Sequence, residues 1–309
     1  MGDRVLVIGE ALIDIVEREG HVAEEHVGGS PANVALGLGR LGVPVRLRTG
    51  LARDDRGMRI ADHLTASGVD VDDESFVLDR TSTAVARLSQ EGDAQYEFDI
   101  QWRIGAPLEL GDAQVVHVGS IGCFIEPGAT RVRDTVRAWG NRARLTFDPN
   151  IRPSLVGDRA ATLQITEDVA SWSDLVKLSV EDAAWLYPGA SVRSVVDRFL
   201  SLGSRLVAVT LGGDGAVIAS TEAWVQVTHP VARVKDTVGA GDTFMAAMAA
   251  ELAQGFQGTN AEELSVAGEF AVAAAAITVS RAGADLPTRV EVEREAQSSA
   301  LRKTQSPQG

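Results

Sequence analysis

Short runs of Val, Ile and Leu recur along the chain and alternate with longer segments of helical periodicity. The apolar runs, which predict strands, fall at 4–8, 45–49, 115–118, 144–148, 174–178 and 206–210. The helical patterns fall at 32–41, 128–139, 158–170, 180–187, 191–202, 243–253 and 261–280. Strands that alternate with helices predict an α/β fold, a three-layer sandwich whose mainly parallel central sheet is covered on both faces.

Two other stretches, 11–27 and 81–100, alternate apolar with polar residues. This period of two predicts half-exposed antiparallel strands, which we expect to form a small sheet beside the main one. Such a sheet can act as a lid over a ligand cleft, as a surface for a homodimer, or as both. We therefore expect a single catalytic domain over 1–295 and a disordered tail over 296–309, where periodicity is lost.

The chain has 309 residues, and 29 basic against 43 acidic residues give a net charge of −14. This balance argues against nucleic acid as a partner. The single cysteine, Cys123, allows no intramolecular disulfide and suits a reducing compartment. We expect no signal peptide and no membrane segment, because the longest apolar stretch, 270–279, is too short to span a bilayer. These features favour a cytoplasmic protein.

The most informative motif is Asp-Thr-Val-Gly-Ala-Gly-Asp at 236–242, directly before a helical run. The first N–H groups of a helix bind anions, and the small residues Gly239, Ala240 and Gly241 let a phosphate approach. A resident phosphate would repel Asp242, so this acid makes most sense as a base that acts on a hydroxyl nucleophile. The motif thus indicates phosphoryl transfer. The alternative is an acid that only complements the helix dipole after a glycine-rich turn.

Two further glycine-rich segments follow predicted strands or precede predicted helices. Gly-Gly-Ser-Pro-Ala-Asn at 28–33 leaves room for a substrate and offers Asn33 to sugar hydroxyls, although a plain turn has the same composition. Thr-Leu-Gly-Gly-Asp-Gly at 210–215 is a candidate nucleotide loop or an ordinary β-turn. The Gly-x-Gly-x-x-Gly at 37–42 lies within and at the end of a helix. It therefore predicts close packing and a helix C-cap rather than a dinucleotide site.

Two strand-associated polar groups complete the candidates. Asp14 alternates with apolar neighbours and gains a role only if a lid covers it, and Asp148, Asn150 and Arg152 follow the strand 144–148. The five histidines show no metal-ligand spacing.

With these three glycine motifs, the chain resembles the ribokinase-like (PfkB) carbohydrate kinases over nearly its full length. The segments Gly-Glu-Ala-Leu-Ile-Asp at 9–14, Phe-Asp-Pro-Asn-Ile-Arg-Pro at 147–153 and Gly-Ser at 119–120 are most similar to those of bacterial fructokinases. The resemblance implies transfer of the γ-phosphoryl group of ATP to a primary sugar hydroxyl, most simply fructose to fructose 6-phosphate.

The resemblance also implies the role of each matching residue. The catalytic residues are the base Asp242 and the anion hole of Gly239, Ala240 and Gly241. The sugar is bound by Asp14, Gly28, Gly29, Asn33 and Arg152, with Tyr96 and Phe98 from the lid. ATP lies along Lys177, Ser179, Thr210, Gly212 and Gly215. Mg²⁺ is held through water by Asp182, and a monovalent cation such as K⁺ lies near Asp236 and residues 281–284.

The chain departs from the family pattern at Ser179-Val180-Glu181-Asp182, where the usual motif is Asn-x-x-Glu. The acid is one methylene shorter, for which Glu181 could compensate. Two alternatives stay open: a 2-keto-3-deoxygluconate kinase, with Arg152 on the substrate carboxylate, and a sensor that binds sugar or nucleotide without turnover. A nicotinamide-dependent oxidoreductase is excluded by its misplaced glycines.

Overall fold

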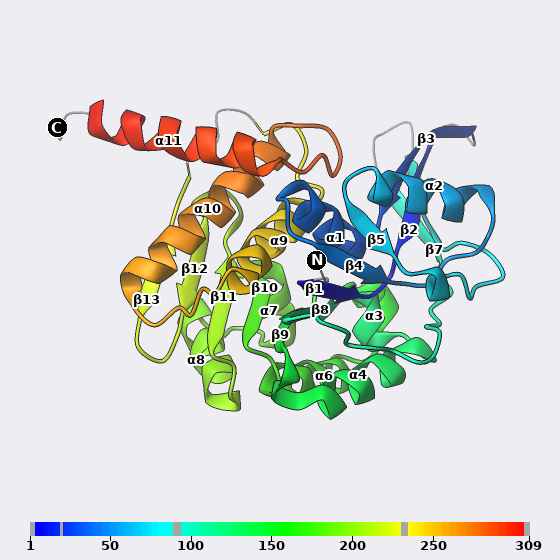
Figure 1. Ribbon diagram of the computed structural model, residues 1–309, viewed down its shortest axis with the longest axis horizontal. Helices are drawn as coiled ribbons and strands as arrows, with labels where there is room; N and C mark the ends of the chain where they lie inside the picture. Colours follow the sequence, from blue (N-terminus) through cyan, green and yellow to red (C-terminus); the bar gives the residue numbers. More distant parts are fainter. Residues whose placement is uncertain (1–3, 19–20, 89–93, 230–233, 306–309) are drawn as a thin grey trace.

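A computed structural model describes residues 4–18, 21–88, 94–229 and 234–305 (Figure 1). Its centre is a nine-stranded sheet in the order β13-β12-β11-β10-β9-β8-β1-β4-β5. Seven strands are parallel, and β12 and β13 continue the sheet as an antiparallel pair at one edge. The strands are β1 (Val5–Ile8), β4 (Val45–Arg48), β5 (Val69–Val71), β8 (Val115–Gly119), β9 (Arg144–Asp148), β10 (Leu175–Ser179), β11 (Leu206–Thr210), β12 (Ala216–Ala219) and β13 (Trp224–Val227).

Helices cover both faces of this sheet, as the alternating pattern predicts (Figure 1). One layer contains α1 (Ser30–Arg40), α2 (Asp55–Thr65), α9 (Ala240–Ala253), α10 (Ala261–Val279) and α11 (Arg289–Gln305). The other contains α4 (Gly128–Trp139), α6 (Arg159–Ser171), α7 (Val180–Leu186) and α8 (Val192–Leu202). Short helices α3 (Ile121–Phe124) and α5 (Pro153–Val156) follow β8 and β9.

Side-chain alternation in β1 shows why the strands read as continuous apolar runs. Val5 and Val7 pack into the core on the α1 and α9 side, whereas Leu6 and Ile8 pack into the core on the α4 and α8 side. All four are at most 2% exposed. A strand buried on both faces has no polar positions to alternate with.

A second, four-stranded sheet stands at one end of the molecule, in the order β3-β2-β6-β7 (Figure 1). Its strands are β2 (Leu12–Arg18), β3 (His21–Gly28), β6 (Thr83–Leu88) and β7 (Ala94–Asp99). The predicted antiparallel pairing holds for β2–β3 and β6–β7, but β2 and β6 pair in parallel. Both begin beside the large sheet, where Ile13 N donates to the Ser82 carbonyl, and run outward together.

The glycines of the 37–42 segment act in packing, as predicted. A Cβ on Gly37 would lie 2.7 Å from Ala246 Cβ of α9, and one on Gly39 would lie 2.3 Å from the Ser67 carbonyl oxygen. The helix ends at Arg40, and Gly42 has a φ of 76°. A dinucleotide-binding motif needs its glycines at a free strand-to-helix turn, whereas these glycines lie within and after α1 and are occupied by helix packing.

Helix α11 differs from expectation, because it continues to Gln305 through much of the segment expected to be disordered. Ala296 and Gln297 are good helix formers, so the helix persists without a periodic apolar stripe. Residues 306–309 lie outside the described part. Among the described residues, no helix combines the length and apolarity that a membrane crossing requires.

Candidate active site

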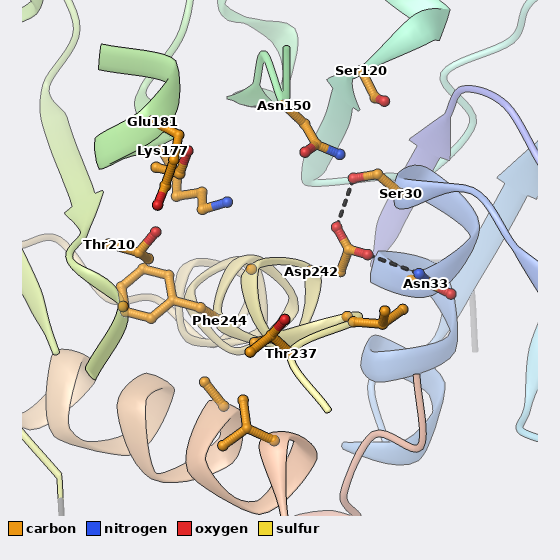
Figure 2. A pocket seen from close by; sticks show the side chains of 18 of the residues that line it. Ser30, Asn33, Ser120, Asn150, Lys177, Glu181, Thr210, Thr237, Asp242 and Phe244 are labelled. Carbon is orange, nitrogen blue, oxygen red and sulfur yellow. Dashed lines mark hydrogen bonds between the residues drawn. The ribbon is translucent and has the colours of Figure 1, made fainter. Parts of the chain in front are cut away.

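A cavity of about 490 Å³ opens at the carboxyl ends of β1, β8, β9, β10 and β11, where α/β sheets bind their ligands. It is walled by α1, the first turn of α9, α10 and the small sheet. The three glycine-rich segments predicted from sequence all contribute to it, through Gly29, Gly212 and Gly239 among others. Figure 2 shows its polar side chains facing one another across the start of α9.

Asp242 lies in the first turn of α9 and is held from the side of α1 (Figure 2). Ser30 Oγ donates to Asp242 Oδ1 at 2.7 Å, and Asn33 Nδ2 donates to Oδ2 at 2.8 Å. The residue is 9% exposed and lines the cavity. Two fixed donors orient the carboxylate while each oxygen keeps a lone pair for a further proton.

The start of α9 is shaped to receive an anion. Gly239 precedes the helix with a left-handed φ of 78°, and Gly239, Ala240 and Gly241 all line the cavity at the helix start, where N–H groups lack partners within the helix. A Cβ on Gly239 would lie 2.9 Å from Ala284 Cβ, and one on Gly241 would lie 2.8 Å from Lys177 Nζ. Position 239 therefore favours glycine through both its φ and its lack of space, whereas a side chain at 241 would displace the lysine ammonium that lies directly beside the helix start.

Lys177 comes from β10 and forms a buried ion pair with Asp148 of β9, with Nζ and Oδ2 2.8 Å apart. Burial alone lowers the pKa of Lys177, but the carboxylates of Asp148, Asp182 and Asp242 outweigh it and raise that pKa. Burial raises the pKa of Asp148 to about 6, against the effect of Lys177. The ammonium therefore stays charged beside the anion site.

The other end of the cavity is acidic. Glu10, Asp14 and Asp242 line it together with one cation, Arg152. Burial raises the pKa of Glu10 to about 7 and that of Asp14 to about 6, although Arg152 lowers both. These acids, with Asn33, give the end a set of acceptors suited to hydroxyl groups.

Glu10, Ser120 and Asn150 also belong to this end. The sequence points to Asn150 only as a polar residue after the strand 144–148, and to Glu10 and Ser120 only as members of segments that carry the family resemblance. Glu10 Oε2 accepts from Gly122 N at 2.9 Å. Ser120 has a φ of 48° and Asn150 a φ of 40°, values that cost energy in residues other than glycine. Both side chains line the cavity from adjacent strands, and strain of this kind concentrates at functional sites. Their signal in the sequence is the position of each at the end of a predicted strand.

The opposite end is apolar on one side and lined by glycines on the other. Helix α10 contributes Val272, Ala275, Ala276 and Val279, which share one helix face at spacings of three and four. Facing them are Thr210, Gly212 and Gly215 after β11, with Ser179 and Glu181 at the start of α7. The predicted nucleotide-loop residues therefore lie along one rim.

Three predicted residues, Gly28, Asp182 and Asp236, do not line the cavity. Gly28 does not line the cavity but lies under Asp14, where a Cβ would be 2.0 Å from Oδ2. Tyr96 belongs to β7, and its side chain lies outside the described part, whereas Phe98 lines the cavity. Arg152 lines it and donates to Asn150 Oδ1 at 2.8 Å.

Asp182 faces away from the cavity. Its Oδ2 accepts from Ser179 N and Oγ at 2.9 and 2.8 Å, a capping box, and its Oδ1 accepts from Ile151 N at 2.7 Å. A carboxylate at the third helical position folds back onto the N-cap, so Glu181, one residue earlier, lines the cavity instead.

Asp236 also lies outside the cavity lining. Its two oxygens accept backbone N–H groups of Val238 at 3.0 Å and Gly283 at 2.8 Å. Burial pushes its pKa upward, but these hydrogen bonds outweigh burial and lower the pKa. The carboxylate therefore ties the loop before α9 to the loop after α10.

Comparison with known proteins agrees with this geometry. The family model described as pfkB family carbohydrate kinase matches residues 3–290. A fructokinase from Rhizobium leguminosarum bv. trifolii is 34% identical over 260 residues, which cover 80% of this chain and 79% of the relative.

Two solved structures have similar folds. A fructokinase from Xylella fastidiosa with bound ATP has a TM-score of 0.82 and 25% identity, and the match covers 96% of this chain and 98% of that one. A provisional ribokinase II from E. coli, in complex with ATP and Mg²⁺, has a TM-score of 0.80 and 25% identity, with 96% and 99% covered.

Proposed function

The chain belongs to the pfkB family of carbohydrate kinases and is an ATP-dependent sugar kinase, and from that premise we propose fructose, phosphorylated on its 6-hydroxyl, as its acceptor. The observation that carries the mechanism is the position of Asp242. It is a carboxylate held by Ser30 and Asn33 at the start of α9, between an end rich in hydroxyl acceptors and a glycine-lined end.

In this proposal Asp242 accepts the proton of the sugar hydroxyl as its oxygen attacks the γ-phosphorus of ATP. The bond from that phosphorus to the β,γ-bridging oxygen breaks, and the electron pair leaves with ADP. The N–H groups of Gly239, Ala240 and Gly241 and the ammonium of Lys177 stabilise the charge on the transferring group. One such donor contributes roughly 3 kcal/mol to lowering the barrier.

The charge of the sugar end favours fructose over 2-keto-3-deoxygluconate. A substrate carboxylate would meet Glu10, Asp14 and Asp242, with Arg152 as the cation at that end, since the other lining cation, Lys177, is paired with Asp148. These acids would repel a substrate carboxylate bound among them. A neutral sugar instead offers hydroxyl donors to these acids. Gly29 lines the cavity, the absence of a Cβ on Gly28 leaves space for the Asp14 carboxylate, and Phe98 supplies an apolar face from the small sheet.

For ATP, we propose that the base lies against the α10 face and the phosphates run past Thr210, Gly212 and Gly215 toward α9. Ser179 and Glu181 stand beside that path. Mg²⁺ commonly binds to one or two carboxylates, water and substrate phosphates, and the described residues offer no cluster of three metal-binding side chains. This fits a phosphate-held ion near Glu181 rather than Asp182. When bound, the ion neutralises phosphate charge.

The predicted site for a monovalent cation at Asp236 is less well supported than the site for Mg²⁺. Both oxygens of Asp236 already accept backbone N–H groups, so that carboxylate alone does not provide a cation site. We propose that K⁺ binds beside the two loops that Asp236 joins, before α9 and after α10, and no step of the mechanism depends on it.

We propose further that the chain is one catalytic domain whose small sheet closes over the sugar and pairs with a second copy in a homodimer. The edge strands β3 and β7 and the exposed Val22, 55% accessible, support this surface. Light scattering of the wild type, and of a variant with a charged residue at Val22, tests the dimer.

We also propose that the protein acts in the cytoplasm, because Cys123 is buried and unpaired, as suits a reducing compartment.

The first experiment is ADP release with ATP, Mg²⁺ and K⁺ against fructose, 2-keto-3-deoxygluconate, ribose, glucose and adenosine. Fructose-dependent turnover supports the proposal. Turnover with the keto acid alone would replace the substrate but keep the mechanism. No turnover with any sugar, while ATP still binds, would favour a sensor.

A further inference from the structure

His229 lies at the apolar end of the cavity, just beyond β13, and takes no part in the mechanism above. Its side chain is 6% exposed and lines the same end as Val272, Ala276 and Gly215. In the proposed orientation of ATP, the purine ring lies at this apolar end, so the buried imidazole of His229 is a polar group beside the base.

The ring is held from outside the cavity by the C-terminal helix. His229 Nε2 lies 3.2 Å from Glu295 Oε1 of α11, whose side chain is 34% exposed. A carboxylate only accepts hydrogen bonds, so Nε2 carries the proton of this pair. In the neutral ring, Nδ1 is then a lone-pair acceptor available to an occupant of the cavity.

The two purine bases of common nucleotides differ in what they offer such an acceptor. Adenine presents an exocyclic amino group, which donates, whereas guanine presents a carbonyl oxygen at the same position, which accepts. We infer that His229, oriented by Glu295, is a specificity-determining contact that accepts a hydrogen bond from the 6-amino group of the ATP adenine. This inference rests on the proposed orientation of ATP in the cavity.

The consequence is that α11, although remote from Asp242, is part of the nucleotide site. Glu295 acts as a positioning residue: it fixes the tautomer and the ring plane of His229 without touching the nucleotide. Its effect should therefore fall on nucleotide selectivity and leave fructose binding alone.

The test compares dissociation constants, by calorimetry, for ATP and for purine riboside triphosphate, which lacks the 6-amino group. In the wild type, loss of one neutral hydrogen bond should weaken binding roughly 3- to 10-fold. His229→Phe keeps a ring of similar shape without an acceptor, so the two constants should become equal. Glu295→Ala should move their ratio toward one, whereas Glu293→Ala, an exposed acid on the same helix, should leave it unchanged.

A wild-type ratio near one, or a His229→Phe variant that keeps the wild-type ratio, overturns the inference. Equal weakening of both nucleotides in Glu295→Ala, with the ratio intact, would assign the pair a structural role only and would also overturn it. The KM for fructose, measured alongside, should not change. Because the ratio is read from binding, it is independent of whether fructose is turned over, so failure of the proposed function is recognised separately.

Discussion

Replacing Asp242 with Asn removes a proton acceptor while keeping the shape of the site. In the wild type, Oδ1 accepts from Ser30 Oγ and Oδ2 accepts from Asn33 Nδ2. The new amide can turn its oxygen toward Asn33 and its NH₂ toward Ser30, whose hydroxyl accepts as readily as it donates. Both hydrogen bonds survive, so the free energy of unfolding should change by about 1 kcal/mol or less.

The rate should respond very differently. Loss of a general base lowers kcat roughly 10²- to 10⁴-fold, which corresponds to about 3–5 kcal/mol in the activation free energy. The assay is coupled ADP release at saturating fructose and ATP, with ATP affinity measured by calorimetry. Since Asp242 stands beside the phosphates without binding them, ATP affinity should stay the same or increase as a negative charge is lost.

Ser30→Ala is the matched control, because it disturbs the same hydrogen bonds but keeps the carboxylate. With the Ser30 donor lost, the carboxylate is still held by Asn33, so kcat should fall less than about 10-fold. If Asp242→Asn retains kcat within a factor of ten, or if Ser30→Ala is equally inactive, Asp242 is not the base and the assigned mechanism fails.

Three other substitutions at the site, and one control away from it, give further predictions. Lys177→Met leaves the Asp148 carboxylate buried without its ion-pair partner, and urea unfolding at pH 8 should show a loss of roughly 3–5 kcal/mol. The loss should shrink as the pH is lowered toward 6, because the pKa of Asp148 is about 6 with Lys177 present and rises further without it, so the carboxyl takes up a proton. Because the pKa of Asp14 is raised to about 6, its charged form is lost as the pH falls through 6, so the KM for fructose should rise there, and Asp14→Asn should remove that pH dependence. Gly28→Ala, whose Cβ would lie 2.0 Å from Asp14 Oδ2, should raise the KM for fructose at least about 10-fold. Gly42→Ala, with nothing within 4 Å of its Cβ but a left-handed φ of 76°, is the control and should lower stability alone.

Much of the fold is readable from the sequence because most central strands are buried on both faces. Runs such as 206–210 contain no polar alternation and stand out against the helices between them. Helix α2 carries a weaker signal, since only Gly57, Ile60 and Leu64 of its eleven residues are buried. The parallel pairing of β2 with β6 is not encoded locally at all: it depends on both strands leaving the same region of the large sheet.

The candidate site is readable where its chemistry lies within one motif. The residues 239–242 form one helix start, so their spacing alone places an acid beside N–H donors. Ser30 and Asn33 reach Asp242 across more than 200 positions of sequence, a contact that requires the packing of α1 on α9. Glu10, Ser120 and Asn150 meet only because β8 lies between β9 and β1, an order that crossovers set and that no local pattern records.

The division of charge in the cavity explains how a protein with a net charge of −14 can hold a polyanion in one orientation. Favourable potential for phosphate is concentrated at one point, where the first turn of α9 meets the ammonium of Lys177. Beyond that point, Glu10 and Asp14 oppose further entry of phosphate but accept hydroxyl groups. In the proposed orientation, with its base against α10, ATP would stop with its terminal phosphate beside Asp242, because phosphate placed any deeper would meet Glu10 and Asp14. On this proposal the acids of the sugar end select the sugar and, by the same charge, set the depth at which ATP comes to rest.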